Sequence, residues 1–507
     1  MNANVVDLKA PAAALCKVLC AVLCAAVLAG CAVGPDYQRP AVAHAERYTE
    51  SPAPESLSAG DTVPVQRLHA DADLPAKWWE MFKSPALDEL VRASLDNNPS
   101  IVAAQAALQA AEHNVKAQQA AYYPNASVSY AGSRQRIADS LASPASSGAS
   151  YYTLHTLQLE VSYTPDVFGA NRRQVESLQA QADNQRWQLE AAYLSLTSNV
   201  VVAVIEEAAL REQIDAARRQ VELQQRIVAS YRRQLELGQV AQTDLILQEA
   251  QMAGLQAALP PLEKQLALQR DLIKALAGRL PSDALAAEFS LAQLHLPEEV
   301  PLTVPSTLVD RRPDVLAAEA QLQSASAGIG VAVAARLPNV ELGVNAWGSS
   351  AYTLGNLFSP GSRFWTLAAS VTQPVFDAGA LKHRELAARA EYDAAVAQYR
   401  ATVISAYQNV ADSLQSIQVD TQALRIAIDN QRAADRTLAI TRRQLELGDT
   451  HSLAVILAEQ GALQAQANVQ IAQANRLSDT ALLFQSLGGG WWNRQDSIVS
   501  TSGAMHP

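Results

Sequence analysis

The chain has 507 residues, of which 49% are hydrophobic and 18% are charged, and its formal net charge is −11. Such a composition can bury a large core and excludes a disordered or fibrous chain. The acidic balance argues against a nucleic-acid partner, because lysine and arginine are scattered rather than gathered into a basic stripe.

The N-terminus has the pattern of an export signal. A largely apolar run from residue 12 to residue 28 is too short for a membrane-spanning helix, which needs about 20 apolar residues. It ends in Leu28-Ala29-Gly30-Cys31, which resembles the lipobox of bacterial lipoproteins. This resemblance implies that residues 1–30 are a lipoprotein signal peptide and that Cys31 is the lipidated first residue of the mature chain. An ordinary signal that is cut elsewhere is the alternative.

The segment that follows is rich in proline, alanine and serine and shows no periodicity. We therefore expect residues 31–75 to form an extended, lipidated tether. All four cysteines lie in the first 31 residues, so the mature chain can contain no internal disulfide.

Two uninterrupted helical segments dominate the rest of the chain. Residues 171–237 contain no proline or glycine, which predicts a helix about 100 Å long at ~1.5 Å per residue. A second such run covers residues 380–447. Gly238 and Gly448 follow these runs and are expected to end the helices, because glycine adopts a left-handed conformation at low cost. A return helix follows each glycine, the first interrupted at Pro260-Pro261, so two coiled-coil hairpins are predicted.

The two hairpins carry the same seven-residue motif. Arg-Arg-Gln-Leu-Glu-Leu-Gly occupies Arg232 to Gly238 and returns at Arg442 to Gly448. Other matching segments occur in the same order at similar separations, such as Tyr123-Pro124-Asn125 and Leu337-Pro338-Asn339. This order predicts an internal two-fold structural repeat rather than helical low complexity that arose twice.

Apolar and polar residues alternate in four segments, which is typical of strands with one apolar face: residues 126–134, 154–163, 339–348 and 364–372. Each segment has about the length of a tilted strand that spans a bilayer. Transmembrane strands are therefore predicted, with a small soluble sheet as the alternative. Four strands cannot close a barrel and open edges are forbidden in lipid, so several copies of the chain must pool their strands.

Together these features resemble the TolC-like outer membrane factor family, in particular its lipoprotein branch, the NodT-type channels of efflux systems. The similarity extends from about residue 75 to residue 488. The similar motifs are Trp78-Trp79 to Leu90, Asp166-Val167-Phe168-Gly169, Arg311-Arg312-Pro313-Asp314 to Leu322 and Gln373-Pro374-Val375-Phe376-Asp377-Ala378-Gly379.

The resemblance implies a mixed α and β membrane protein. A homotrimer would form a transmembrane β-barrel from four strands per chain and a long α-helical coiled-coil barrel. The implied order is a signal peptide (1–30), the tether (31–75), a first repeat (76–278), an equatorial linker (279–310), a second repeat (311–488) and a flexible C-terminal tail (489–507).

The implied function is that of the outer membrane exit duct of a tripartite efflux pump for small toxic compounds. Its partners would be a periplasmic adaptor protein, an inner-membrane transporter and outer membrane lipid. Ala32 after the cysteine implies sorting to the outer membrane, with the chain extending into the periplasm. The alternatives are an exit duct for type I protein secretion and a lipid-anchored coiled-coil structural protein of the envelope.

In this family the turn after each long helix is the periplasmic tip, where the adaptor docks and the tunnel narrows. The match assigns Gly238 and Gly448 to the tip turns and Asp244 to adaptor docking. It places Leu453 at a hydrophobic constriction and Leu457 where relatives commonly have an aspartate ring. An apolar gate is therefore expected. The alternative is that Leu453 and Leu457 pack within the coiled coil.

No catalytic group, cofactor or metal site is predicted. The sequence offers no nucleophile with a nearby base, and its glycine-rich stretches lack the strand and helix that a phosphate loop needs. No histidine has the spacing to a cysteine or carboxylate that is typical of a metal site: His44, His69, His113, His155, His295, His383, His451 and His506.

Overall fold

The computed structural model describes eight stretches of the chain, namely residues 32–41, 47–52, 54–60, 63–69, 72–136, 151–285, 288–302 and 305–494. The chain divides into two compact units, each assembled from three separate stretches. Unit 1 contains residues 1–40, 108–184 and 318–399. Unit 2 contains residues 41–107, 185–317 and 400–507.

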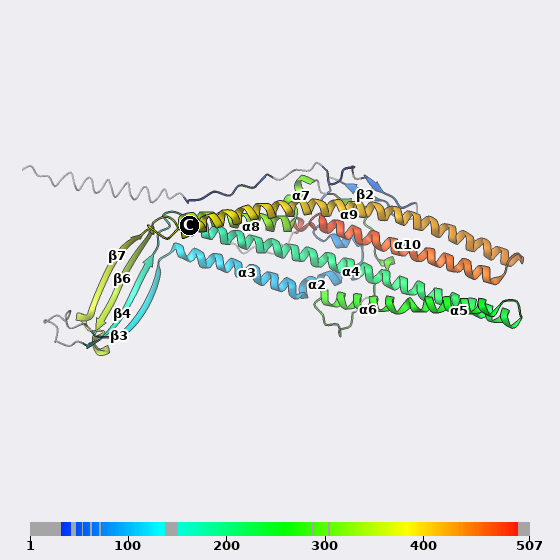
Figure 1. Cartoon of the computed structure of the whole chain (residues 1–507), viewed down its shortest axis with the longest axis horizontal. Coiled ribbons are helices and arrows are strands. Elements are labelled where there is room, and N and C mark those ends of the chain that lie inside the picture. The colour runs from blue at the N-terminus through cyan, green and yellow to red at the C-terminus, as the bar shows by residue number, and fades with distance from the viewer. Residues whose placement is uncertain are drawn as a thin grey trace, which may run out of the picture. The chain divides into compact units, whose positions relative to one another are not determined.

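Helices make up most of the described chain (Figure 1). The α-helices are α2 (Pro85–Asn97), α3 (Pro99–Gln119), α4 (Ala170–Glu236), α5 (Gln242–Ala257), α6 (Leu259–Leu276), α7 (Pro305–Arg311), α8 (Pro313–Ala334), α9 (Ala380–Leu447) and α10 (Ser452–Ser486). The short 3-10 helices are η1 (Trp78–Phe82), η2 (Ala120–Tyr122), η4 (Leu291–Gln293), η5 (Leu354–Asn356), η6 (Pro360–Ser362) and η7 (Trp491–Asn493).

Two small sets of strands accompany the helices. The strands are β1 (Ser56–Leu57), β2 (Gln66–His69), β3 (Asn125–Arg136), β4 (Tyr151–Tyr163), β5 (Glu299–Pro301), β6 (Asn339–Ala351) and β7 (Arg363–Thr372). The strands predicted from alternation, β3, β4, β6 and β7, are all present and each is slightly longer than expected.

Unit 1 contains a four-stranded antiparallel sheet in the order β3-β4-β6-β7 (Figure 1). The β3–β4 pair is regular from Asn125 opposite Ser162 to Arg136 opposite Tyr151. Irregularities interrupt the other two pairs, after Leu159 in β4 and after Asn345 in β6. Such bulges increase the local twist of a sheet.

Unit 2 contains the two predicted hairpins except for the first residues of α4 and α9, which belong to unit 1. The turn between α4 and α5 and the turn between α9 and α10 lie at the same end of this unit (Figure 1). The first return helix is broken as expected, because α6 begins with two prolines in its first turn, where a missing N–H costs little. Buried residues recur every three or four positions in α4, at Val200, Val201, Val204, Ile205 and Ala208.

Residues 31–75 were expected to be an extended tether, and this expectation is wrong for part of the segment. β1 pairs with β2, and β2 pairs in parallel with β5 from the predicted linker. Ala59 is buried in an apolar cluster with Leu424 of α9 and Val469 of α10. The local composition predicts no strand here, because the pairing partner is distant in sequence.

The expected flexible tail is ordered at its start. The Trp491 ring lies 5.1 Å from the Trp187 ring between centroids, and its Nε1 donates a 2.7 Å hydrogen bond to the Arg311 carbonyl. Aromatic rings of this size bury a large apolar area when they find such a surface. Residues 489–494 are therefore part of unit 2, and the rest of the predicted tail lies outside the described residues.

Candidate functional site

The two hairpin turns have the same backbone structure. Gly238 and Gly448 adopt φ values of +69° and +79°, which lie in the left-handed region. In both turns the N–H of the residue after the glycine donates to a carbonyl five residues earlier, at 2.8 Å. This satisfies carbonyls that the helix end leaves without partners. The prediction that each glycine ends its helix is confirmed.

The repeated motif also places an ion pair across each hairpin. Nη2 of Arg232 lies 2.7 Å from Oε1 of Glu249, and Nη2 of Arg442 lies 2.8 Å from Oε1 of Glu459. Each glutamate follows its arginine by 17 residues. The first arginine of the motif thus joins the long helix to its return helix close to the turn.

The second hairpin has an additional contact. Oε2 of Glu459 lies 3.2 Å from Nη2 of Arg226 on α4, so this carboxylate bridges arginines of both hairpins. One residue further along α10, Gln460 donates a 3.0 Å hydrogen bond to the fully buried Gln224 of α4. Gln224 in turn donates to the Gln248 side chain on α5 at 3.0 Å. A polar layer therefore connects the second return helix to both helices of the first hairpin.

Sequence reasoning did not predict this layer. A signal was present, because Glu249 and Glu459 follow their motif glycines at the same spacing. The contact from Glu459 to Arg226 has no such signal, since it joins residues of different repeats. The glutamines are common throughout the chain, so their pairing is not visible without the packing.

The predicted docking residue Asp244 forms a hydrogen bond that stabilises the start of α5, just after the first hairpin turn. Its Oδ2 accepts a 3.1 Å hydrogen bond from the Ala241 N–H, three residues earlier. This carboxylate satisfies a donor at the start of α5, and its negative charge is favourable at a helix N-terminus. Asp244 is half-buried, so its side chain still reaches solvent.

The two candidate gate residues differ in burial. Leu453 has 8% of its surface exposed, whereas Leu457, one helical turn later on α10, has 53% exposed. Leu453 therefore packs within unit 2, as the coiled-coil alternative expects. Leu457 presents an apolar side chain at the surface near the second tip.

The sheet of unit 1 has one continuous apolar face. Register places Val128 opposite Leu159 and, further along, Val344 opposite Leu367, while Val161 pairs with Val344. Val128 and Leu367 are each 71% exposed. The opposite face carries polar side chains in register: Ser127, Glu160, Asn345 and Thr366.

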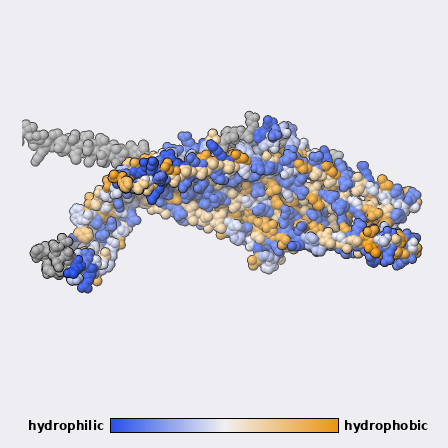
Figure 2. All heavy atoms as spheres, in the orientation of Figure 1, coloured by the Kyte–Doolittle hydropathy of each residue, from blue (hydrophilic) through white to orange (hydrophobic). Residues whose placement is uncertain are grey.

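The long helices also expose apolar residues. Ile404, Ile426 and Ile440 of α9 are exposed, as are Ile246 and Leu247 of α5. Figure 2 shows apolar residues at the surface along these helices, mixed with polar ones.

Cys31, the predicted lipidation site, lies outside the described residues. Within the ranges that the structure describes, no group of three or more His, Cys, Asp or Glu side chains is arranged to hold a metal ion.

The model of the family described as "Outer membrane efflux protein" matches residues 90–279 and 304–489. The chain belongs to the outer membrane efflux protein family. The pyoverdine export outer membrane protein OpmQ of Pseudomonas putida is 30% identical over 422 residues, 82% of this chain and 88% of its own. The probable efflux pump outer membrane protein TtgC of the same species is 29% identical over 491 residues, 94% of this chain and 97% of its own.

The structure of the outer membrane channel OprN superposes on this efflux protein with a TM-score of 0.78 and 25% identity, over 91% of this chain and 100% of that one. The resemblance predicted from motifs is confirmed. This protein is an outer membrane efflux channel with the mixed helix-and-strand fold of such channels, located in the outer membrane and the periplasm.

Proposed function

We propose that this channel is a homotrimeric exit duct for small toxic compounds, joined through a periplasmic adaptor to an inner-membrane transporter. The amphipathic sheet carries the proposal. One face exposes the apolar side chains of Val128, Leu367 and Val371. Covering this surface with lipid or protein would be favourable, because it removes apolar area from water. The opposite face is polar, as the wall of a water-filled channel must be.

The edges of the sheet support the oligomer. β3 and β7 each pair on one side only among the described strands. An unpaired strand edge in lipid costs several kcal/mol for each unsatisfied group, so closure needs further copies of the chain. The family resemblance supports three copies, whose sheets would join into one barrel.

The order of elements supports an internal repeat. Both halves place a helix, two antiparallel strands and a long hairpin in succession, from α3 to α6 and from α8 to α10. The apolar residues exposed on α5 and α9 would be covered in a helical barrel made from repeated hairpins.

The tips supply the proposed docking and gating surfaces. Gly238, Asp244 and Gly448 shape the turns that would meet the adaptor, and Leu457 with Leu453 would form an apolar gate. The substrate class is supported by relatives named for toluene efflux and for antibiotic efflux in Pseudomonas putida. Cys31 would carry the lipid anchor.

The function is tested by deleting the gene and measuring the minimum inhibitory concentrations of toluene and hydrophobic antibiotics. We expect sensitisation, which the wild-type gene on a plasmid reverses. Unchanged tolerance, together with loss of a secreted protein from the medium, would instead support the type I secretion alternative. The mass of the purified channel in detergent, corrected for bound detergent, tests the trimer.

A further inference from the structure

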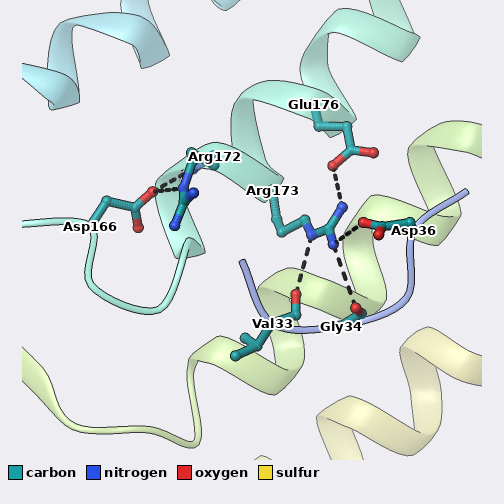
Figure 3. Close-up of polar contacts among 7 residues, drawn as sticks. All are labelled: Val33, Gly34, Asp36, Asp166, Arg172, Arg173 and Glu176. Carbon is teal, nitrogen blue, oxygen red and sulfur yellow. Dashed lines mark hydrogen bonds and ion pairs between the residues drawn. The ribbon is translucent and has the colours of Figure 1, made fainter. Parts of the chain in front are cut away.

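The first described residues of the chain lie against helices α4 and α8 of unit 1 and are held there partly through their backbone (Figure 3). The Val33 N–H donates a 3.1 Å hydrogen bond to the Phe168 carbonyl. Nε of Arg173 donates to the Val33 carbonyl at 3.2 Å, and its Nη2 lies 3.5 Å from the Gly34 carbonyl. These contacts are independent of the side chain at position 33.

Arg173 is the centre of this site. Its side chain is 6% exposed, and its guanidinium lies 2.6 Å from Asp36 and 2.7 Å from Glu176 (Figure 3). The Asp36 side chain is otherwise 90% exposed. Glu176 of the same helix pairs with Nη1 of this arginine. Val33, Gly34 and Asp36 supply the partners of Nε and Nη2, which would be costly to leave unpaired in a nearly buried side chain.

Glycines make room for the segment. A Cβ at Gly330 of α8 would lie 2.7 Å from Cγ of Arg173 and 3.0 Å from the Val33 carbonyl oxygen. A Cβ at Gly34 would lie 2.5 Å from the Gly330 Cα. Gly328, two residues earlier on the same helix, has nothing within 4 Å of a Cβ. The close approach of Val33 and Arg173 to α8 therefore requires glycine at position 330 but not at position 328.

A second contact holds the end of the segment. Glu319 of α8 accepts a 3.2 Å hydrogen bond from the Tyr37 hydroxyl and lies 2.7 Å from Nη2 of Arg39. Residues 32–39 are thus bound along both α4 and α8. We use the name clasp for residues 32–39.

The beginning of the clasp lies at the start of α4. A Cβ at Gly169 would lie 2.6 Å from the Ala32 Cα, and Gly169 has a φ of +76° that suits glycine. Gly169 follows the last residue of β4, Tyr163, by a short turn. The residue that precedes Ala32 in the sequence is the proposed lipidated Cys31, which lies outside the described residues.

We propose that the clasp binds Arg173 of α4 and Glu319 and Gly330 of α8, and thereby holds the lipid on Cys31 at the periplasmic end of the transmembrane sheet. The inference rests on the proposed lipidation and membrane insertion. If the segment were a free tether of n residues, the root-mean-square distance between its two ends would be about 5–6 Å × √n, so the lipid would not be fixed relative to the strands. A bound clasp fixes lipid and strands at one membrane level, which raises the effective concentration of the strands at the bilayer.

The test uses Val33→Cys as a reporter, because the native cysteines all lie at or before residue 31. The side chain at 33 is half-buried when the clasp is bound. In the full-length channel we expect Gly330→Ala to raise the rate of maleimide labelling of V33C about tenfold, equivalent to ~1.4 kcal/mol. Gly328→Ala, the matched control, leaves the rate unchanged. The fraction of channel recovered as membrane-inserted trimer falls in Gly330→Ala and not in Gly328→Ala.

Asp36→Ala is the second variant, because an exposed carboxylate can be removed without harm to helix packing. It is expected to accelerate V33C labelling and reduce insertion in the same direction. Equal labelling rates in Gly330→Ala and Gly328→Ala would overturn the bound clasp. Faster labelling with full insertion would overturn its role in positioning the lipid. Incorporation of labelled palmitate at Cys31 is measured in parallel, and its absence in the parent chain would overturn the lipid anchor while the labelling rates still report on the clasp.

Discussion

Arg442 and Glu459 form an ion pair across the second hairpin, with 2.8 Å between Nη2 and Oε1. Arg232 and Glu249 form the equivalent pair in the first hairpin at 2.7 Å. The repeated motif therefore repeats a contact as well as a turn. The hairpins differ because Glu459 also contacts Arg226, so the second tip is connected to the first by charge.

This difference predicts unequal effects of two matched substitutions. Glu459→Gln removes the charge that joins the two hairpins, whereas Glu249→Gln weakens a contact within one hairpin. We expect Glu459→Gln to increase single-channel conductance in planar bilayers and Glu249→Gln to leave it nearly unchanged. Equal conductances in the two variants would show that the bridge to Arg226 does not restrain the tip.

Substitution of Gly448 is expected to lower stability through backbone strain and not through a steric clash. Nothing lies within 4 Å of a Cβ at this position, so a substitution there is limited by the left-handed φ alone. Gly448→Val should cost about 1–2 kcal/mol and Gly448→Asn less, since asparagine tolerates this conformation. Thermal unfolding checks the order. Adaptor pull-down should weaken in Gly448→Val while the trimer persists.

Two substitutions of Asp244 distinguish the effect of its charge from the effect of its hydrogen bond at the start of α5. Asp244→Asn keeps an oxygen that can accept from the Ala241 N–H but removes the charge, whereas Asp244→Ala removes both. If the carboxylate binds the adaptor, both variants lose adaptor in a pull-down. Loss in Asp244→Ala alone would assign the residue to helix capping, which is worth about 1 kcal/mol.

Leu453 and Leu457 predict opposite outcomes. Leu457→Ser makes an exposed apolar position polar and should raise single-channel conductance if this residue keeps the aperture dry. Leu453→Ser creates a buried cavity and a buried hydroxyl, so it should lower thermal stability by about 2–5 kcal/mol. A conductance increase from Leu453→Ser with unchanged stability would instead place Leu453 at the constriction.

The carboxyl of Asp479 on α10 predicts a pH dependence of stability. Burial, followed by the hydrogen bond and negative charge of Asp420 on α9, raises the pKa of Asp479 to about 7. Because this pKa lies above that of an unfolded chain, the contribution to stability is present at low pH and is lost as pH rises through about 7.

Asp479→Asn cannot lose a proton and should therefore melt at a higher temperature than wild type at pH 8, with the difference shrinking toward pH 5. Asp412→Asn is the control, because Asp412 is exposed and lines a cavity that Asp479 also lines. A difference that is constant from pH 5 to pH 8 would contradict the raised pKa of Asp479.

Patterns of neighbouring residues were sufficient to predict the long helices and the strands of the four-stranded sheet. Long stretches without glycine or proline predicted α4 and α9, and strict alternation predicted β4 and β6, because both depend on neighbours in the sequence. The same patterns were insufficient for β1 and β2. Their partner β5 belongs to another part of the chain, and strand pairing depends on contacts that composition does not encode.

By itself, the sequence determined the family, the hairpins with their glycine turns, and the strands with one apolar face. Each of these follows from local periodicity or from motifs of a few residues. Only the tertiary structure decided that Leu453 is buried while Leu457 is exposed, that Glu459 bridges Arg442 and Arg226, and that Val33 is bound by Arg173. These relationships join residues whose proximity arises from packing, and burial and hydrogen bonding are set by neighbours in space rather than in sequence.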